Sequence, residues 1–564
     1  MYKKVTLIIL IFCITLLIGC TRQSTSISVS DTNETAIRWR DKGVEQMIRE
    51  YLDKPSGTIY PSDLASIEQL NIYDTDIQWA DESDEAFVKR KNEDKTLRQE
   101  KTVIERSVFF LDDFIHFPNL KHLTIEKGNL ANLRGIEQLT HLQSLDLSGS
   151  QLQDISPLAE LTNLRSLDLS NNTSMQSFET LANLVNLETL DLTKCGKPKS
   201  PLDLTSLASL TKLKTLYLPE YCISFEPLNN LTTLEELTLE NTDTLDFLIK
   251  MKNLEVLSFR SRGSIEIAPL NHVNKLKQLT INHTSLDDLT PLKELHELER
   301  ISLVFSNITN IEPLKELSHL KSLVLQTDSS LDLSPISQLT QLEELTLAGQ
   351  NFSDISSLDA LVNLQALVLR SEQIENIAPL TNLTQLQSLE LASKQVTDYS
   401  AIGTLLHLNK LVIPNGEVDN IDFLTKLTSL KHLNLLANEI TDFSPLNNLA
   451  KLEYLDLSSN KISDLSFLNN LTSLTSLFLD NNAIEDISDI SKLTSLRTLS
   501  LKQNKIANIE PLKELKSLEN LLIKDNAFKE ITPIADLPNL AYLSVSYTIS
   551  DLTPAKHVRI LDIW

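Results

Sequence analysis

The sequence predicts an α/β solenoid: a horseshoe of stacked repeats with a concave parallel β-sheet of about 20 strands and mostly 3-10 or irregular turns on the convex side. Three observations predict it. Leucines recur at a fixed period, the residues between them alternate as in a strand with one buried face, and prolines recur in a short return path. A chain of 564 residues built in this way buries one continuous core and needs no boundaries between globular domains.

The period is set by the first leucine of a Leu-x-x-Leu-x-Leu triplet. It begins at Leu120 and advances by 20 to 26 residues per step as far as Leu254. From Leu254 to Leu540, leucine then stands at every one of thirteen steps of 22 residues. Because 22 residues are too few for a strand and a full helix, the return path must consist of short turns.

Two residue types mark these turns. Proline presets φ and gives up an N–H that a short 3-10 turn leaves unpaired, and it recurs at Pro157, Pro227, Pro269, Pro291, Pro313, Pro335, Pro379, Pro445, Pro511 and Pro533. Three residues past the last strand leucine, an amide can satisfy the turning backbone at Asn172, Asn438, Asn460, Asn482, Asn504 and Asn526. Several middle repeats depart from this pattern, so we expect less regular turns there; they carry Arg262, Asp328, Gln350, Glu372, Lys394 and Gly416.

Each unit resembles the 22-residue repeat of the internalin group of bacterial leucine-rich-repeat proteins, as in residues 452–473, LEYLDLSSNKISDLSFLNNLTS. The resemblance covers about four fifths of the chain. It implies a leucine-rich-repeat horseshoe with an N-terminal helical cap, in which the concave face, often through aromatic residues, holds a protein partner. It does not identify that partner, because one fold hosts many functions.

The N-terminus has the sequence features of an export signal followed by a membrane anchor. Residues 1–19 have the pattern of a lipoprotein signal peptide, with Lys3 and Lys4 before an apolar run that is short for a membrane span. The segment Leu17-Ile18-Gly19-Cys20 resembles a bacterial lipobox, in which the cysteine sulfur receives a diacylglyceryl group. Residues 20–40 then read as a flexible tether. We expect lipidation at Cys20 to hold the protein on the extracytoplasmic face of the cell membrane, as its only anchor.

Residues 41–116 read as an N-terminal cap with a charged insertion, and residues 117–564 as the solenoid with a C-terminal cap. Within the first segment, residues 43–52 have apolar side chains at helical spacing and residues 63–72 read as the first strand. The charged stretch 73–110 is either a solvated helix beside the cap or a partner-docking element. Near residues 558–563 we expect a shortened last strand.

Side chains between the strand leucines line the concave face in columns. In the C-terminal third these columns hold large apolar groups, which predict a partner-binding patch of Tyr454, Phe478, Leu522, Tyr542 and Leu436, with Tyr547 near it. The alternative is mutual packing of ordinary surface residues. A secondary acidic patch of Asp146, Asp168 and Asp191 either serves a cation or basic partner or reflects the frequency of Leu-Asp-Leu in such repeats.

Composition argues against several classes of function. The net charge of −25 makes nucleic acid an unexpected partner. The ten histidines lack metal-binding spacing, and with only 11 glycines no phosphate loop is found, so we predict no catalytic residue, metal or cofactor. Cys195 is expected to point inward and Cys222 outward, as two free thiols.

These observations predict a cell-surface scaffold, adhesin or receptor-like, that binds a host or envelope protein on its concave face. The alternative is an envelope lipoprotein that binds the cell's own proteins or wall polymers. An enzyme is the least expected class.

Overall fold

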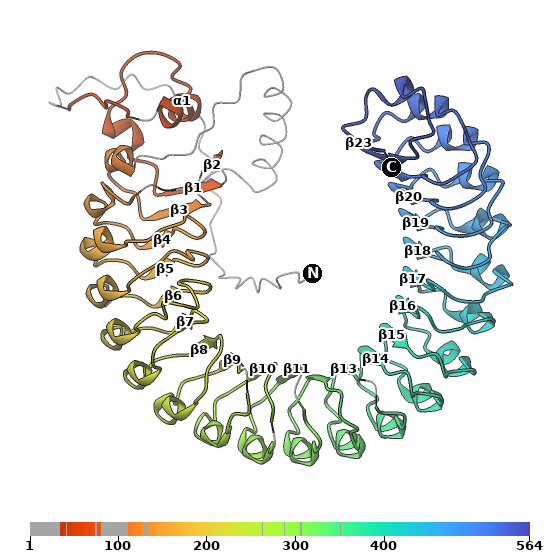
Figure 1. Ribbon diagram of the computed structural model, residues 1–564, viewed down its shortest axis with the longest axis horizontal. Coiled ribbons are helices and arrows are strands. Elements are labelled where there is room, and N and C mark those ends of the chain that lie inside the picture. The colour runs from red at the N-terminus through yellow and green to blue at the C-terminus, as the bar shows by residue number, and fades with distance from the viewer. Residues whose placement is uncertain are drawn as a thin grey trace, which may run out of the picture.

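The computed structural model describes residues 34–40, 42–73, 76–79, 111–127, 130, 132–261, 263–286, 288–304, 307–349 and 351–563. They form a horseshoe whose inner side is lined by strands and whose outer side carries short helices (Figure 1). The two arms face each other across an open hollow (Figure 1). The predicted α/β solenoid is therefore confirmed.

The strands form one sheet of 23. Their bounds are β1 (Gln69–Tyr73), β2 (Asp76–Trp79), β3 (His122–Glu126), β4 (Ser144–Asp146), β5 (Ser166–Asp168), β6 (Thr189–Asp191), β7 (Thr215–Tyr217), β8 (Glu236–Leu239), β9 (Val256–Arg260), β10 (Gln278–Asn282), β11 (Arg300–Val304), β12 (Ser322–Gln326), β13 (Glu344–Ala348), β14 (Ala366–Arg370), β15 (Ser388–Ala392), β16 (Lys410–Val412), β17 (His432–Asn434), β18 (Tyr454–Asp456), β19 (Ser476–Phe478), β20 (Thr498–Ser500), β21 (Asn520–Leu522), β22 (Tyr542–Val545) and β23 (Ile560–Ile563).

From β3 onward each strand pairs in parallel with the next, so equivalent residues of successive repeats lie side by side. Leu367 of β14, for example, has Leu345 as its partner on one side and Leu389 on the other. The leucines of the repeated Leu-x-x-Leu-x-Leu triplet are buried, and they belong to a single core that runs along the whole arc. The side chains between them consequently form continuous columns on the concave face.

The return paths are 3-10 turns on the convex side, as predicted. Each 3-10 helix from η4 (Ser156–Glu160) to η21 (Thr532–Asp536) is five residues long. Proline often stands in the first turn, as Pro511 does in η20 (Glu510–Glu514), where its missing N–H would have had no partner within the helix.

Where asparagine follows a strand, the strand is three residues long and ends in a left-handed turn. After β18, Ser459 has φ 56°. The next residue, Asn460, donates from Nδ2 to the carbonyl oxygens of Leu435 and Leu457, at 3.0 Å each. The amide thus satisfies turning backbone in two successive repeats, as the sequence indicated.

The turns of the middle repeats are built differently from those that carry asparagine. Each strand from β9 to β15 is five residues long, and after β14 and β15 a hydroxyl one position earlier takes the place of the amide. Ser371 and Ser393 are buried, and their Oγ atoms donate to the carbonyl oxygens of Phe352 and Ile374 at 2.6 and 2.7 Å. After these strands the backbone has stayed extended for two more residues than in the three-residue strands. The lower regularity expected of the middle turns stays a prediction, because residues 262, 287, 305–306 and 350 of these turns lie outside the described residues. Of the middle residues singled out by sequence, Arg262 and Gln350 lie outside the described residues.

The N-terminal end of the core is closed by α1 (Lys42–Tyr51), which buries Val44 and Ile48. Next to it, β2 pairs antiparallel with β1 on the side away from β3, an arrangement that the sequence did not predict. The rest of the charged stretch, residues 80–110, lies outside the described residues, and so does Cys20, the predicted lipidation site.

At the other end, β23 pairs in parallel with β22. Among the helices that the structure describes, none is long and apolar enough to cross a bilayer.

Candidate protein-binding face

Three aromatic rings lie against one another on the concave side of the C-terminal arm. The rings of His432 and Tyr454 are stacked, with centroids 4.0 Å apart and planes at 11°. Phe478 continues the row at 5.3 Å from Tyr454 and 39°. We call these three side chains the ring ladder. It crosses β17, β18 and β19, because Tyr454 is the register partner of His432 and Phe478 that of Asp456.

The rings of the ladder are half-buried, so each keeps part of its surface toward solvent. Burial raises the pKa of Tyr454, and the charge of Asp456 adds to the shift. Burial lowers the pKa of His432; Lys410 lowers it further, and Asp456 opposes them. These shifts favour the neutral forms, so the ladder presents an uncharged aromatic surface at neutral pH.

The ladder contains two of the five residues predicted for the partner-binding patch. Leu436 lies just after β17, half-buried, with its N–H held by Asn434 Oδ1 at 2.9 Å. It therefore flanks the ladder on the same repeat as His432. His432 itself was missed, although its place 22 residues before Tyr454 in the same column was a signal that could have found it.

Leu522 and Tyr542 lie apart from the ladder. Ser500 stands between Phe478 and Leu522 in the register of β19, β20 and β21. The Tyr542 hydroxyl donates to Asp562 Oδ2 at 2.8 Å, which directs the ring toward β23. The residues predicted as one patch thus divide into the ring ladder and a second, smaller group at the end of the arm.

The acidic patch has a structural explanation. Asp146, Asp168 and Asp191 are register partners on β4, β5 and β6, and each accepts a hydrogen bond from the backbone N–H two residues later, at 2.9, 2.7 and 2.7 Å. Asp456 makes the same bond on the other arm. The same arrangement therefore ends several of the three-residue strands, on both arms. Within the described residues, no three His, Cys, Asp or Glu side chains are placed to hold a metal ion.

The concave face of the N-terminal arm is nonetheless strongly acidic. The columns over β3 to β8 hold no Lys or Arg, and their carboxylates are Glu126, Asp146, Asp168, Asp191, Glu236 and Glu240. Burial raises the pKa of Asp146, and the neighbouring charge of Asp168 adds to this. A partner with a basic surface would be attracted to this arm at low ionic strength.

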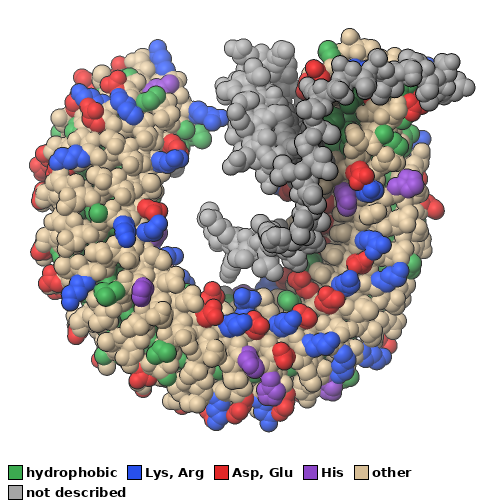
Figure 2. All heavy atoms as spheres, turned by 180° about the vertical axis from the view of Figure 1, so that it is seen from behind, with side chains coloured by type: hydrophobic (Ala, Val, Ile, Leu, Met, Phe, Trp, Pro, Cys, Tyr) green, Lys and Arg blue, Asp and Glu red, His purple; other side chains and the backbone are tan. Residues whose placement is uncertain are grey.

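Charges beside the strands are paired between repeats. Lys321 contacts Glu299 at 3.0 Å and Lys431 contacts Glu453 at 2.8 Å, in each case one repeat apart. Figure 2 shows blue and red side chains next to one another around the arc. Because these ion pairs are exposed, each contributes about 0 to 1 kcal/mol to the free energy of unfolding. Since the opposite charges lie next to each other, the surface beside the strands carries no large region of one charge sign.

The two cysteines in the described part of the solenoid are free thiols. Cys195 points into the core, as predicted, and burial raises its pKa to about 12. The prediction that Cys222 points outward is wrong: it is partly buried against the core, and burial raises its pKa to about 12 as well. The long preceding repeat brings Leu202 alongside as its bridge partner, which covers this position.

Comparisons with known proteins agree with this geometry. Residues 428–470, 450–492 and 472–514 match a family model described as leucine-rich repeats in two copies. A TLR13–ssRNA13 complex is similar in fold, with 22% identity and a TM-score of 0.55, covering 80% of this chain and 69% of that one.

Two bacterial structures are also similar. A Leptospira interrogans leucine-rich-repeat protein has 23% identity and a TM-score of 0.49, covering 65% of this chain and 91% of its own. An internalin, InlF, from Listeria monocytogenes has 24% identity and a TM-score of 0.31, covering 85% and 94%. No curated protein sequence matches the chain. The chain thus contains leucine-rich repeats in a solenoid, a fold typical of protein-binding scaffolds and receptors.

Proposed function

We propose that this chain is a lipid-anchored protein of the bacterial cell surface that binds a protein partner through the concave face of its C-terminal arm. The ring ladder of His432, Tyr454 and Phe478 is the observation that carries the proposal. Aromatic side chains with one apolar face and one polar edge are enriched among the residues that dominate binding energy at protein interfaces.

The ladder is already ordered before any partner arrives. Each ring is held by its neighbour and by a strand whose position is fixed by the repeats on both sides. Little side-chain entropy is then lost on binding, which favours affinity. Free aromatic surface facing solvent on adjacent strands otherwise lowers solubility, so its presence supports an interaction role over a purely structural one.

A protein suits this surface better than a nucleic acid. The chain carries a net charge of −25, and the concave face of the N-terminal arm adds carboxylates without Lys or Arg in the described columns. A polyphosphate backbone would be repelled by such a face, since nucleic-acid affinity depends on neutralising phosphates with basic side chains. The RNA in the similar TLR13 structure is bound by that receptor, and it is not transferred to this chain.

The surface location rests on the sequence of the N-terminus. Lipidation of Cys20 would attach two acyl chains at one end of the tether, and two chains are what stable anchoring needs. The solenoid would then stand outside the membrane with its hollow open to other proteins.

The test is affinity capture with residues 21–564 on beads, applied to surface proteins of host cells and of the bacterium itself. Tyr454→Ser with Phe478→Ser should reduce recovery of the captured partner by about tenfold or more, because residues of this kind cost about 2 kcal/mol or more when truncated. The matched control is Leu406→Ser, which removes an apolar side chain that is 53% exposed outside the strands. Equal capture by the double variant and the wild type, with equal melting temperatures, would refute the site.

A further inference from the structure

The last strand of the sheet, β23, exposes side chains at positions that are buried in the preceding repeats (Figure 1). Leu561 and Ile563 are the register partners of Leu543 and Val545 on β22. The side chains of Leu543 and Val545 are fully buried, whereas Leu561 and Ile563 are 37% and 46% exposed. The difference arises because β22 has a strand on each side, while the described residues provide none on the far side of β23. The core of the solenoid is therefore open at this end.

Exposed apolar side chains are concentrated at the same end. Eleven large apolar side chains are exposed in the part of the chain that the structure describes, and seven of them are spread over residues 60–406. The other four belong to β23 and to the turn before it: Tyr547, Ile560, Leu561 and Ile563. Apolar groups gathered in this way indicate an interaction surface, whereas single exposed ones do not.

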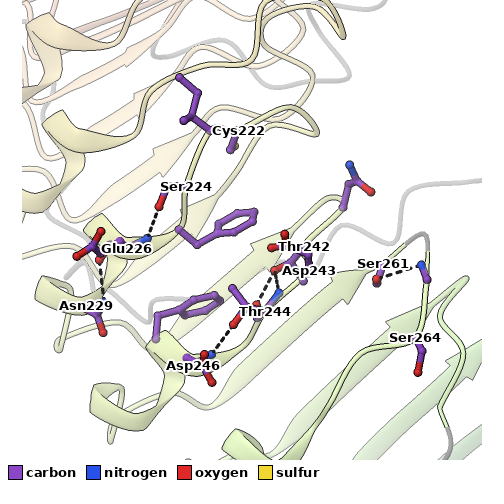
Figure 3. A pocket seen from close by; sticks show the side chains of 15 residues that line it. Cys222, Ser224, Glu226, Asn229, Thr242, Asp243, Thr244, Asp246, Ser261 and Ser264 are labelled. Atoms are coloured by element: carbon purple, nitrogen blue, oxygen red, sulfur yellow. Dashed lines mark hydrogen bonds between the residues drawn. The ribbon is translucent and has the colours of Figure 1, made fainter.

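The grooves between neighbouring repeats have a different origin. One of about 670 Å³ opens beside Cys222 and Asp246 (Figure 3), and one of about 660 Å³ opens beside Tyr399 and Phe423. The first lies where the repeats are shortened and the second where the period is 22 residues. Because the two grooves are equal in size, they follow from the stacking of repeats in general. The open end is instead the place where stacking stops.

The backbone of β23 is arranged to pair with a further strand. In a parallel ladder, alternate residues direct their N–H and C=O groups to the same neighbouring strand. The N–H of Ile560 donates to the carbonyl oxygen of Ala541 at 2.9 Å, so Ile560 and Asp562 are the residues that pair with β22. Leu561 and Ile563 consequently direct their N–H and C=O groups to the open edge. Such an edge is a template for pairing with another chain.

The charges at this end favour a second copy of the chain as the occupant. The chain as a whole has a net charge of −25, so two copies repel each other in most orientations. Residues 546–563 carry two acidic and two basic side chains, Asp551, Asp562, Lys556 and Arg559, and are therefore balanced. A head-to-tail contact is disfavoured, because α1 already covers the core at the other end of the solenoid.

We propose that two copies of the chain pair antiparallel through β23 and thereby close the open end of both cores. A two-fold axis perpendicular to the sheet makes the two strands antiparallel and brings the same surface of each copy into contact. With the axis at Leu561, the exposed leucines pack on each other and their outward N–H and C=O groups pair. Ile560 then lies opposite Asp562 of the second copy. An axis at Asp562 would instead place two carboxylates directly opposite each other, which is unfavourable.

The oligomeric state of residues 21–564 in solution tests this proposal. Sedimentation equilibrium at micromolar concentrations should show monomer and dimer in equilibrium. Ile563→Lys places a charge in the interface, and Leu561→Pro removes an N–H that points away from β22, so each should weaken the dimer about tenfold or more. Leu406→Lys is the control, because it adds the same charge at an exposed apolar position outside the strands, and it should dimerise as the wild type does.

Disulfide formation tests the register of the two strands. Residues that face each other as a hydrogen-bonded antiparallel pair have Cα atoms about 5.5 Å apart, which a disulfide can span. Leu561→Cys should therefore form a covalent dimer on mild oxidation. Ile563→Cys should not, because its two copies lie about 14 Å apart in this register. The wild type retains Cys195 and Cys222 and gives the background.

Three results would each overturn the proposal: a wild type that stays monomeric, a dimer that persists in both Ile563→Lys and Leu561→Pro, or equal cross-linking of the two cysteine variants. Equal melting temperatures of Ile563→Lys and Leu406→Lys would show that loss of the dimer does not result from unfolding. The ring ladder lies on β17 to β19, outside this interface. Failure of dimerisation and failure of partner capture are therefore separate results.

Discussion

Asn438 ties its own repeat to the preceding one through Val418. Its Oδ1 accepts a hydrogen bond from the N–H of Val418 at 2.9 Å, and its Nδ2 donates to the carbonyl oxygen of Ile413 at 2.8 Å. The side chain is buried, so no water replaces these partners if the amide is removed. One side chain therefore carries backbone hydrogen bonding across a junction between repeats.

Asn438→Ala is expected to destabilise this junction by about 1 to 3 kcal/mol, the cost of leaving buried backbone groups unpaired. Because a solenoid is stabilised mainly between nearest neighbours, the effect should be local. Hydrogen–deuterium exchange should accelerate over residues 413–420. Asn469→Ala, at a half-buried position of η18 (Ser466–Asn470) in another repeat, is the control and should change nothing at that junction. Unchanged exchange in the Asn438 variant would contradict the assignment.

The repeats show why the sequence predicted part of the turns and not the rest. The role of Asn438 follows from its spacing, because an amide at that position can serve few other purposes. Ser371 and Ser393 gave no such signal, because serine occurs at many positions of these repeats. Whether their hydroxyls point inward depends on a backbone that stays extended beyond the strand leucines, and this conformation is set by the neighbouring repeats.

The acidic patch offers a test that separates charge from hydrogen bonding. In Asp146→Asn the amide oxygen can still accept from the Ser148 N–H, as Asn434 accepts from Leu436, while the charge is lost. Burial raises the folded pKa of Asp146 above its ordinary value of 3.8. Ionisation therefore costs stability: the cost is absent below pH 3.8, grows as the pH rises to the folded pKa, and is constant above it.

We therefore expect Asp146→Asn to raise the urea midpoint at pH 7 and to lose this advantage below pH 3.8. Asp146→Ala, which also removes the acceptor, should be less stable than Asp146→Asn by about 1 kcal/mol. If Asp146→Asn proved less stable than the wild type at pH 7, the charge of the Asp146 carboxylate would stabilise the fold. That result would contradict the explanation that burial and the charge of Asp168 make its ionisation unfavourable.

The anchor is tested by replacing the cysteine that the lipobox resemblance selects. Cys20→Ser keeps a side chain of similar size but offers no sulfur for the diacylglyceryl group. Without two acyl chains, membrane attachment should fall to background. Cell fractionation should place the wild type with the membranes and the variant in the soluble or secreted fraction. Cys222→Ser, in the solenoid, is the matched control, and membrane retention of the Cys20 variant would show that another segment anchors the chain.

The candidate binding face was predicted less completely than the fold. Tyr454 and Phe478 were both predicted for it because aromatic residues in adjacent strands are visible in the columns, and the register places them side by side. Tyr542 was assigned to the same patch because its column suggested it, yet its hydroxyl is held by Asp562, a residue of the last strand. Histidine is neither clearly apolar nor clearly charged in a sequence pattern, and only the stacked geometry reveals that His432 belongs to the ladder.

His432 also makes the ladder sensitive to pH. Burial first, and then Lys410, lower its folded pKa below the ordinary 6.5, so protonation is easier in the unfolded chain. Its contribution to stability is therefore fully present above pH 6.5 and is lost as the pH falls from there through the folded pKa. His432→Phe keeps a ring in the stack and removes the titration.

Calorimetric melting temperatures between pH 8 and pH 5 should consequently fall less for His432→Phe than for the wild type. His116 in the cap, whose pKa burial also lowers, remains in both proteins, so its contribution cancels in the comparison. Partner capture should show the same difference. At pH 5 the wild type should capture less partner than at pH 8, whereas His432→Phe should capture the same amount, because a charged imidazolium in the stack would disturb an otherwise neutral surface. Identical pH profiles for the two proteins would show that the stacked imidazole is protonated as easily in the folded protein as in the unfolded chain. The ladder would then not be sensitive to pH.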